Sequence, residues 1–273
     1  MTEEFIPENL TSARHIFKEE VQTWKPEKGK DFWIDYFYDE KIIHSEDVSK
    51  AAEWLLKNAL SPVTQKQKDE LLFASLLHDI GRFEEINRLS KDRKDKTDHG
   101  VCTAKLLRQR GLKDEALILA LEHHGHSEPL YYNDERVQSL SDTQKKRSKK
   151  IFEFVRDVDR IGNFHRWTLT KDTLEKIDGE VSVHTKSVNK EVIDDIFHSR
   201  PVDYKKLRSF EDRIAAITSW VFALYLKESF MYINHFKTMR GMFYLLEKHV
   251  DDKSTVALIE ERVNEHIQKQ LVK

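Results

Sequence analysis

Residues 71–83 read LLFASLLHDIGRF, an apolar run at helical spacing that leads into His78 and Asp79 and is then broken by Gly81. Adjacent residues on a helix project about 100° apart, so an imidazole and a carboxylate at its end can reach one metal ion beyond the last turn. The carboxylate of Asp79 remains free to bridge to a second ion. Because an isolated His-Asp pair more often lies on a protein surface, the interpretation depends on the other histidines and aspartates.

A series of such residues lies near the ends of other predicted helices or beside their apolar stripes. They are His44 in HSEDVSKAAEWLL, His99 in DHGVCTAKLL, His123 and His124 after LILALE, and Asp157 and Asp159 in VRDVDRIGN. We expect their side chains to converge in the core of one helical bundle. Imidazoles and carboxylates are ligands for Fe, Mn, Zn, Ni and Co, and the thiolates of a structural zinc site are absent from this set. The pattern therefore predicts a metal centre in an all-helical protein.

The rest of the chain also favours an all-α fold. Apolar residues recur at helical spacing almost throughout, and the 273 residues include only 8 Gly and 5 Pro, too few for a turn-rich β fold. The predicted helices span 46–59, 66–80, 98–109, 113–124, 144–164, 190–198, 208–232, 234–249 and 254–270. Between them we expect an ordered loop over 126–143, anchored by Leu130, Tyr131 and Tyr132, and a flexible insertion over 170–190.

Composition narrows the classes of partner. The chain has 46 basic and 48 acidic side chains and a formal net charge of -2, so no bulk attraction to nucleic acid or to an anionic membrane follows. The basic cluster over 145–150 is predicted to be a solvated helix start. The aromatic side chains of the 208–232 helix are expected in the core or in a homodimer interface; they are Phe210, Trp220, Phe222, Tyr225 and Phe230.

Three features favour a cytoplasmic protein. Cys102 is the single cysteine, so no disulfide can form within the chain, and the N-terminal residues MTEEF are acidic where a signal peptide is basic. The longest apolar stretch, 215–226, has 12 residues and falls short of the roughly 20 that cross a bilayer. It predicts a buried helix.

The order of the candidate ligands resembles the signature of the HD-domain superfamily of metal-dependent phosphohydrolases: a first His (His44), an adjacent His-Asp pair (His78-Asp79) and a late Asp (Asp159). The run HDIGRF, followed by DHG, resembles an HD subgroup with additional histidine ligands. The resemblance covers about residues 40–165 and implies a helical bundle of the HD-domain type with additional C-terminal helices. The implied parts are an N-terminal helical extension over 1–40, an HD metal-binding core over 41–165 and a C-terminal helical region over 166–273 packed on the core.

The resemblance also implies the ligands. His44, His78, Asp79 and Asp159 form the minimal site with Asp79 as the bridge, while His99 and one of His123 and His124 serve a second ion. The family pattern favours His124, although both histidines bind metal in some HD proteins. Asp159 is preferred to Asp157 because DRIGN resembles the Asp-Arg-Leu-His-Asn run of alarmone hydrolases. One or two divalent ions are expected, two being preferred, and Mn, Fe, Ni, Co, Zn or Mg can serve.

The function implied by this resemblance is phosphoester hydrolysis by a metal-activated water, on a nucleotide or a related small phosphorylated metabolite. Asp79 and Arg82 are the catalytic candidates, because Arg82 is placed to pair with a substrate phosphate; an ordinary surface residue is its alternative. His126 and Lys105 are further candidates for phosphate binding.

Specific substrates do not follow from the motifs. Gly162 departs from the alarmone-hydrolase run, and GHSEP after His124 lacks the Gly-Tyr-Pro element of the cyclic-dinucleotide enzymes. Two other functions stay open. One is an HD-fold mixed-valent di-iron oxygenase, which uses the same four His and two Asp, and the other is a binding module without catalysis.

Overall fold

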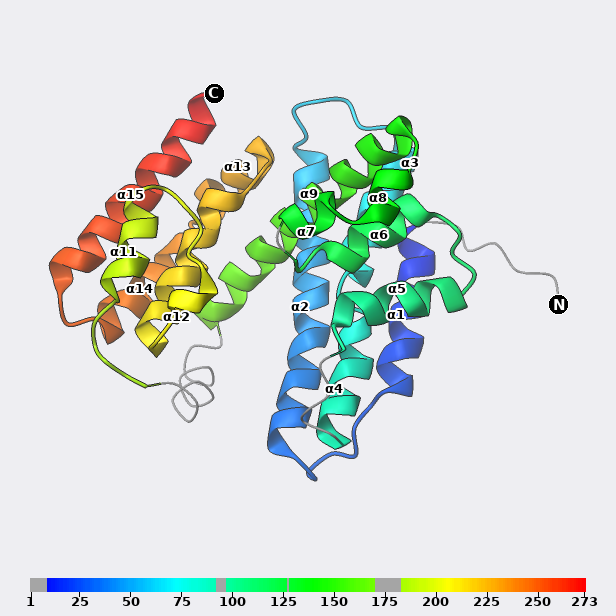
Figure 1. Cartoon of the computed structure of the whole chain (residues 1–273), viewed down its shortest axis with the longest axis horizontal. Coiled ribbons are helices and arrows are strands. Elements are labelled where there is room, and N and C mark those ends of the chain that lie inside the picture. Colours follow the sequence, from blue (N-terminus) through cyan, green and yellow to red (C-terminus); the bar gives the residue numbers. More distant parts are fainter. Residues whose placement is uncertain (1–8, 92–96, 127, 170–182) are drawn as a thin grey trace. The chain divides into compact units, whose positions relative to one another are not determined.

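The computed structural model describes residues 9–91, 97–126, 128–169 and 183–273, and its regular secondary structure is helical throughout these ranges (Figure 1). The prediction of an all-α fold is confirmed. The chain divides into two compact units, with the boundary between Asp159 and Arg160. Most of the predicted flexible insertion, residues 170–182, lies outside the described residues. Across the described ranges, every helix is too short or too polar to span a bilayer.

The N-terminal unit is built from α1 (Leu10–Thr23), α2 (Phe32–Lys57), α3 (Gln65–Leu77), α4 (Gly81–Lys91), α5 (His99–Gln109), α6 (Glu115–His123), α7 (Glu128–Tyr132), α8 (Glu135–Ser139) and most of α9 (Asp142–Leu169). Helices α1 and α2 pack against α3, α4 packs against α2 and α5, and α5 packs against α6. Periodicity missed α1, α4 and the first part of α2, where aromatic side chains follow one another too closely to show a helical period. As a result, His44 lies inside α2 and does not open it.

Polar caps set the starts of the helices that carry the site. Thr64 and Gln67 form a reciprocal capping box at the start of α3. The Asp98 carboxylate accepts a hydrogen bond of 2.8 Å from the Gly100 amide, which makes His99 the first residue of α5. Asp114 caps α6 in the same way. Local chemistry therefore determines where the histidines lie along their helices.

Two glycines allow neighbouring backbones to touch. A Cβ on Gly81 would overlap the His99 carbonyl oxygen and the Thr103 amide nitrogen, and a Cβ on Gly100 would overlap the Glu122 carbonyl oxygen. The Gly81 amide also donates a 3.0 Å hydrogen bond to the Thr103 hydroxyl. The turn that carries the His-Asp pair therefore lies against the start of α5, which in turn lies against the end of α6.

The segment predicted as an ordered loop, 126–143, contains the short helices α7 and α8. Tyr131 is its anchor: its ring stacks on Phe152 with centroids 4.1 Å apart, and its hydroxyl donates to Ser148 Oγ at 2.8 Å. Leu130 does not anchor the segment, because it is 58% exposed.

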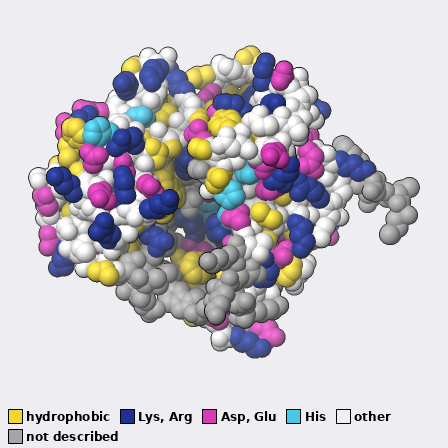
Figure 2. All heavy atoms as spheres, viewed as in Figure 1, with side chains coloured by type: hydrophobic (Ala, Val, Ile, Leu, Met, Phe, Trp, Pro, Cys, Tyr) yellow, Lys and Arg dark blue, Asp and Glu magenta, His cyan; other side chains and the backbone are white. Residues whose placement is uncertain are grey.

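The expectation of a solvated helix start over 145–150 is wrong for two residues, Arg147 and Ser148. Ser148 is fully buried. Arg147 is half-buried and pairs with Glu70 of α3 and Asp114 at the start of α6. Over the face in view, Figure 2 shows basic and acidic side chains interspersed, in keeping with the balanced charge.

The C-terminal unit contains the end of α9, then α11 (Lys190–Phe197), η1 (Tyr204–Lys206), α12 (Phe210–Thr218), η2 (Ser219–Ala223), α13 (Lys227–Phe236), α14 (Met239–His249) and α15 (Lys253–Val272). The prediction of one helix over 208–232, with a buried helical stretch at 215–226, is wrong, because α12 ends at Thr218. Ser219 Oγ donates to the Ala216 carbonyl and accepts from the Val202 amide, so a side chain satisfies backbone groups where the helix stops.

Candidate metal centre

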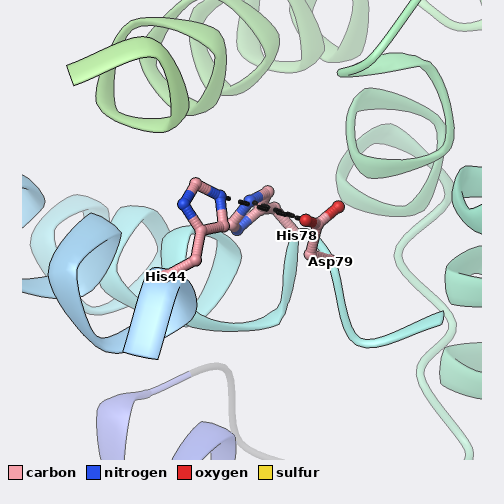
Figure 3. Close-up of side chains that lie close together, drawn as sticks. All are labelled: His44, His78 and Asp79. Atoms are coloured by element: carbon pink, nitrogen blue, oxygen red, sulfur yellow. Dashed lines mark ion pairs between the residues drawn. The ribbon is translucent and has the colours of Figure 1, made fainter. Parts of the chain in front are cut away.

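Six of the predicted side chains meet inside the N-terminal unit. His44 comes from α2, His78 and Asp79 from the turn after α3, His99 from the start of α5, His124 from the end of α6, and Asp159 from α9. Figure 3 shows His44 on its helix pointing toward the His78–Asp79 turn, with both imidazoles directed at the carboxylate. The cluster is almost closed to solvent, since five of the six residues are buried and the Asp159 side chain is 23% exposed.

The two oxygens of Asp79 face different histidines. Asp79 Oδ2 lies 3.9 Å from His44 Nε2 and 3.7 Å from His78 Nε2. Asp79 Oδ1 lies 3.4 Å from both His99 Nε2 and His124 Nε2. One carboxylate thus separates two pairs of imidazoles, the arrangement that a bridging ligand between two ions requires.

The late aspartate joins the first pair of imidazoles. Asp159 Oδ1 lies 2.9 Å from His44 Nε2 and 3.6 Å from His78 Nε2. Asp157 on the same helix is fully buried. The difference between the two aspartates is direction: Asp159 points at the histidines, and Asp157 is not among the clustered ligand atoms of the described residues.

Backbone carbonyls orient two of the imidazoles. His78 Nδ1 lies 2.8 Å from the Ser75 carbonyl, and His124 Nδ1 lies 2.7 Å from the Leu121 carbonyl. Because a carbonyl only accepts, each Nδ1 carries the proton and each Nε2 presents a lone pair to the cluster. His78 Nε2 is buried and has no hydrogen-bond partner among the described residues. A buried acceptor directed at two carboxylates fits a metal ion between them.

The electrostatics agree with this donor set. Burial lowers the pKa of His44 and of His124, which favours the neutral, ligating imidazole. Burial opposes ionisation of Asp79, but Lys41 and His78 hold its pKa well below the usual range. Burial likewise opposes ionisation of Asp159, but the nearby imidazoles of His44 and His78 hold its pKa well below the usual range. Ionised carboxylates beside neutral imidazoles are what a divalent ion needs.

His78 differs from the other two imidazoles. Burial lowers its pKa, but the nearby Asp79 and Asp159 outweigh burial, and the net effect is a raised pKa. A metal ion held between Asp79 and Asp159 would compete with a proton for His78 Nε2.

The family model of the HD domain matches residues 42–167, a range that includes all six side chains. Residues 42–167 belong to the HD-domain family. The family is generally one of metal-dependent hydrolases, and the buried His/Asp cluster is consistent with that dependence. No curated protein and no solved structure matches the chain.

Of the two adjacent histidines of the HD domain, only His124 faces the cluster. His123 turns away, and its Nε2 lies 2.8 Å from Asp134 Oδ2. Neighbouring helical residues project about 100° apart, so one of the pair points inward and the other anchors α8. We therefore leave His123 out of the proposed ligand set.

The predicted phosphate-binding residues lie at different places. Arg82 is half-buried at the cluster, with its Nε 3.6 Å from Asp79 Oδ1 and its Nη1 2.7 Å from Glu85. His126 contacts Asp98, which is not a proposed ligand. Its Nε2 lies 3.5 Å from Asp98 Oδ1, and this carboxylate raises the pKa of His126. Lys105 is 60% exposed and lies near Glu84 of α4. Only Arg82 contacts a proposed ligand.

Sequence reasoning missed two residues beside the cluster. Lys41 Nζ lies 2.7 Å from Asp79 Oδ2, and the spacing of one helical turn before His44 is the signal that identifies its face of α2. Asp98, beyond capping α5, brings its Oδ2 within 3.4 Å of His99 Nδ1. Such a carboxylate behind a ligating imidazole orients the ring and raises its basicity.

Proposed function

We propose that the chain is a metal-dependent phosphohydrolase that hydrolyses a phosphoester of a nucleotide or a related small phosphorylated metabolite. One observation carries the proposal: the two oxygens of Asp79 face separate pairs of imidazoles, His44 with His78 and His99 with His124. This is the geometry of a carboxylate shared by two ions. When bound, two divalent ions in such a site lower the pKa of a water toward neutrality and stabilise charge that develops on a phosphoryl group.

The ligand roles follow from the distances. His44, His78 and Asp159 surround one side of Asp79 and would hold the first ion. His99 and His124 would hold the second from the other side. Nitrogen and oxygen ligands without thiolate suit Mn, Fe, Co, Ni or Zn, and Mg is less suited to four imidazoles.

Two cations flank the bridging carboxylate and fit a phosphorylated substrate. Lys41 approaches Asp79 Oδ2, and Arg82 approaches Asp79 Oδ1; their side chains are 26% and 31% exposed. Metal binding at Asp79 would repel both cations from the carboxylate, so they would turn toward an anion that enters the site. The guanidinium of Arg82 offers paired donors to two phosphate oxygens, while Lys41 offers a compact charge.

Metal analysis followed by a substrate screen tests the proposal. We expect the purified full chain to retain about one to two transition-metal ions. With Mn, Co, Ni, Zn, Fe or Mg restored, it should release inorganic phosphate from a nucleotide or a simple phosphomonoester, or a linear dinucleotide from a cyclic dinucleotide. Asp79→Ala should abolish this release, and Asp194→Ala, which changes an exposed carboxylate of the C-terminal unit, should not.

Two outcomes oppose the proposal. Metal content near zero after growth in supplemented medium would contradict the proposed metal centre. Oxygen uptake by the iron-loaded protein, with a mixed-valent electron paramagnetic resonance signal and no phosphate release, would instead assign the HD-fold oxygenase chemistry.

A further inference from the structure

A second cluster of metal-ligating side chains lies in the C-terminal unit, outside the HD domain. It consists of His184, Glu211 and His249, which each present one ligand atom, all within 4.8 Å of one another. His184 precedes α11, Glu211 lies in the first turn of α12, and His249 is the last residue of α14. Helices α12 and α14 pack together, so the two helix ends bring Glu211 and His249 to the same place.

Glu211 is a fully buried carboxylate whose two oxygens have different surroundings. Oε2 accepts hydrogen bonds from the Thr185 amide at 3.1 Å and the Thr185 hydroxyl at 3.3 Å. Oε1 faces His184 Nδ1 at 3.3 Å. The amide therefore fixes the carboxylate group through one oxygen and directs the other at the imidazoles.

Phe210 holds the two imidazoles in place. Its ring is buried and lies 4.9 Å from the His184 ring and 5.0 Å from the His249 ring, between centroids. The two imidazole rings are 6.0 Å apart and inclined by 30°. Such a distance leaves room for an ion between the rings without a large rearrangement.

Backbone hydrogen bonds fix the segment that carries His184. The Phe210 amide donates to the Val183 carbonyl at 3.1 Å, and the Asp251 amide donates to the Lys186 carbonyl at 2.9 Å. The segment is thereby attached to the start of α12 and to the residues after α14. Preorganised ligands lose little conformational entropy on binding an ion, which favours a specific site.

We propose that His184, Glu211 and His249 bind one divalent transition ion of the Zn²⁺ type, which clamps the segment before α11 to α12 and α14. Two imidazoles and one carboxylate are an established zinc ligand set, and they leave a coordination position for water. The His184 side chain is 38% exposed, so an ion can enter from solvent. This site shares no residue with the HD cluster, and its existence does not depend on phosphohydrolase activity.

Metal counting on the full chain tests this site. After saturation with Zn²⁺ and dialysis, His184→Ala and His249→Ala should each contain one equivalent less than wild type, whatever the occupancy of the HD domain, and should lose the corresponding Zn²⁺-dependent rise in Tm. The matched control is His198→Ala, an exposed histidine at the end of α11 that pairs with Asp194. It should keep the wild-type content.

A gain-of-signal variant covers the case in which an alanine variant fails to fold. His249→Cys replaces the imidazole by a thiolate ligand, so Co²⁺ should produce a sulfur-to-cobalt charge-transfer band that wild type lacks. The buried Cys102 is common to both proteins and cancels in the comparison. Wild-type metal content in both alanine variants, or a Co²⁺ spectrum of His249→Cys without that band, would overturn the proposal.

Discussion

His44 Nε2 lies 2.9 Å from Asp159 Oδ1, although 115 positions separate the two residues in the chain. His44 lies in the middle of α2 and Asp159 in α9. This contact brings the first and last residues of the HD signature into one cluster. The carboxylate of α9 that binds metal could come from Asp157 or from Asp159, and the first prediction separates these two positions.

Asp159→Asn should lower metal occupancy and abolish turnover, because an amide is a weak ligand beside a cation and removes the negative charge that His44 and His78 face. Asp157→Asn should leave metal content near wild type. Since Asp157 is fully buried, this control is expected to lower the free energy of unfolding by about 1–3 kcal/mol. Elemental analysis and urea unfolding of both variants separate the two effects. If Asp157→Asn loses metal and Asp159→Asn keeps it, the ligand is Asp157.

Asp79→Ala should remove both metal and activity, because its two oxygens serve both imidazole pairs. Arg82→Ala should raise KM by about tenfold or more with metal content unchanged, since the lost guanidinium is proposed to bind the substrate phosphate and is not a proposed metal ligand. Steady-state kinetics with parallel metal analysis distinguish the two. If Arg82→Ala strips the metal, or Asp79→Ala still turns over, the assigned roles are wrong.

His124→Ala should lower the metal content of the side of Asp79 that faces His99, because the His124 imidazole points at Asp79 Oδ1. His123→Ala should keep the metal and instead loosen α8, through loss of the 2.8 Å contact with Asp134. Hydrogen exchange of residues 134–139 and metal analysis give independent readouts. Equal metal loss in both variants would make both histidines ligands.

Gly81→Ala should destabilise the HD domain by about 1–3 kcal/mol, because the new Cβ overlaps the His99 carbonyl and the Thr103 amide. Helix propensity alone predicts the opposite sign, a gain of up to about 1 kcal/mol for alanine over glycine. Val101→Ala on α5 is the control, since this side chain is 43% exposed and should change stability little. Thermal or urea unfolding measures the sign, and a stabilised Gly81→Ala would contradict the backbone contact.

The local features of this protein follow from its sequence. Helix starts and stops depend on nearby residues. Here they are set by the apolar run into His78 and Asp79, the glycine after that pair and the acidic cap before His99. These features predicted an all-α fold, and the resemblance to the HD signature then named seven candidate ligands, six of which meet in the HD domain.

The direction of each side chain depended on packing. His123 and His124 are neighbours, and Asp157 and Asp159 share one helix, so each choice requires knowing which face of α6 or α9 meets the other helices. Lys41 reached Asp79 only through the packing of α2 on α3, and the break at Ser219 came from its hydrogen bond with Val202. Sequence periodicity records that a residue lies on a helix and near an apolar stripe. Which atoms then face each other is decided by contacts between segments far apart in the chain, because tertiary packing sets the rotation of each helix about its axis.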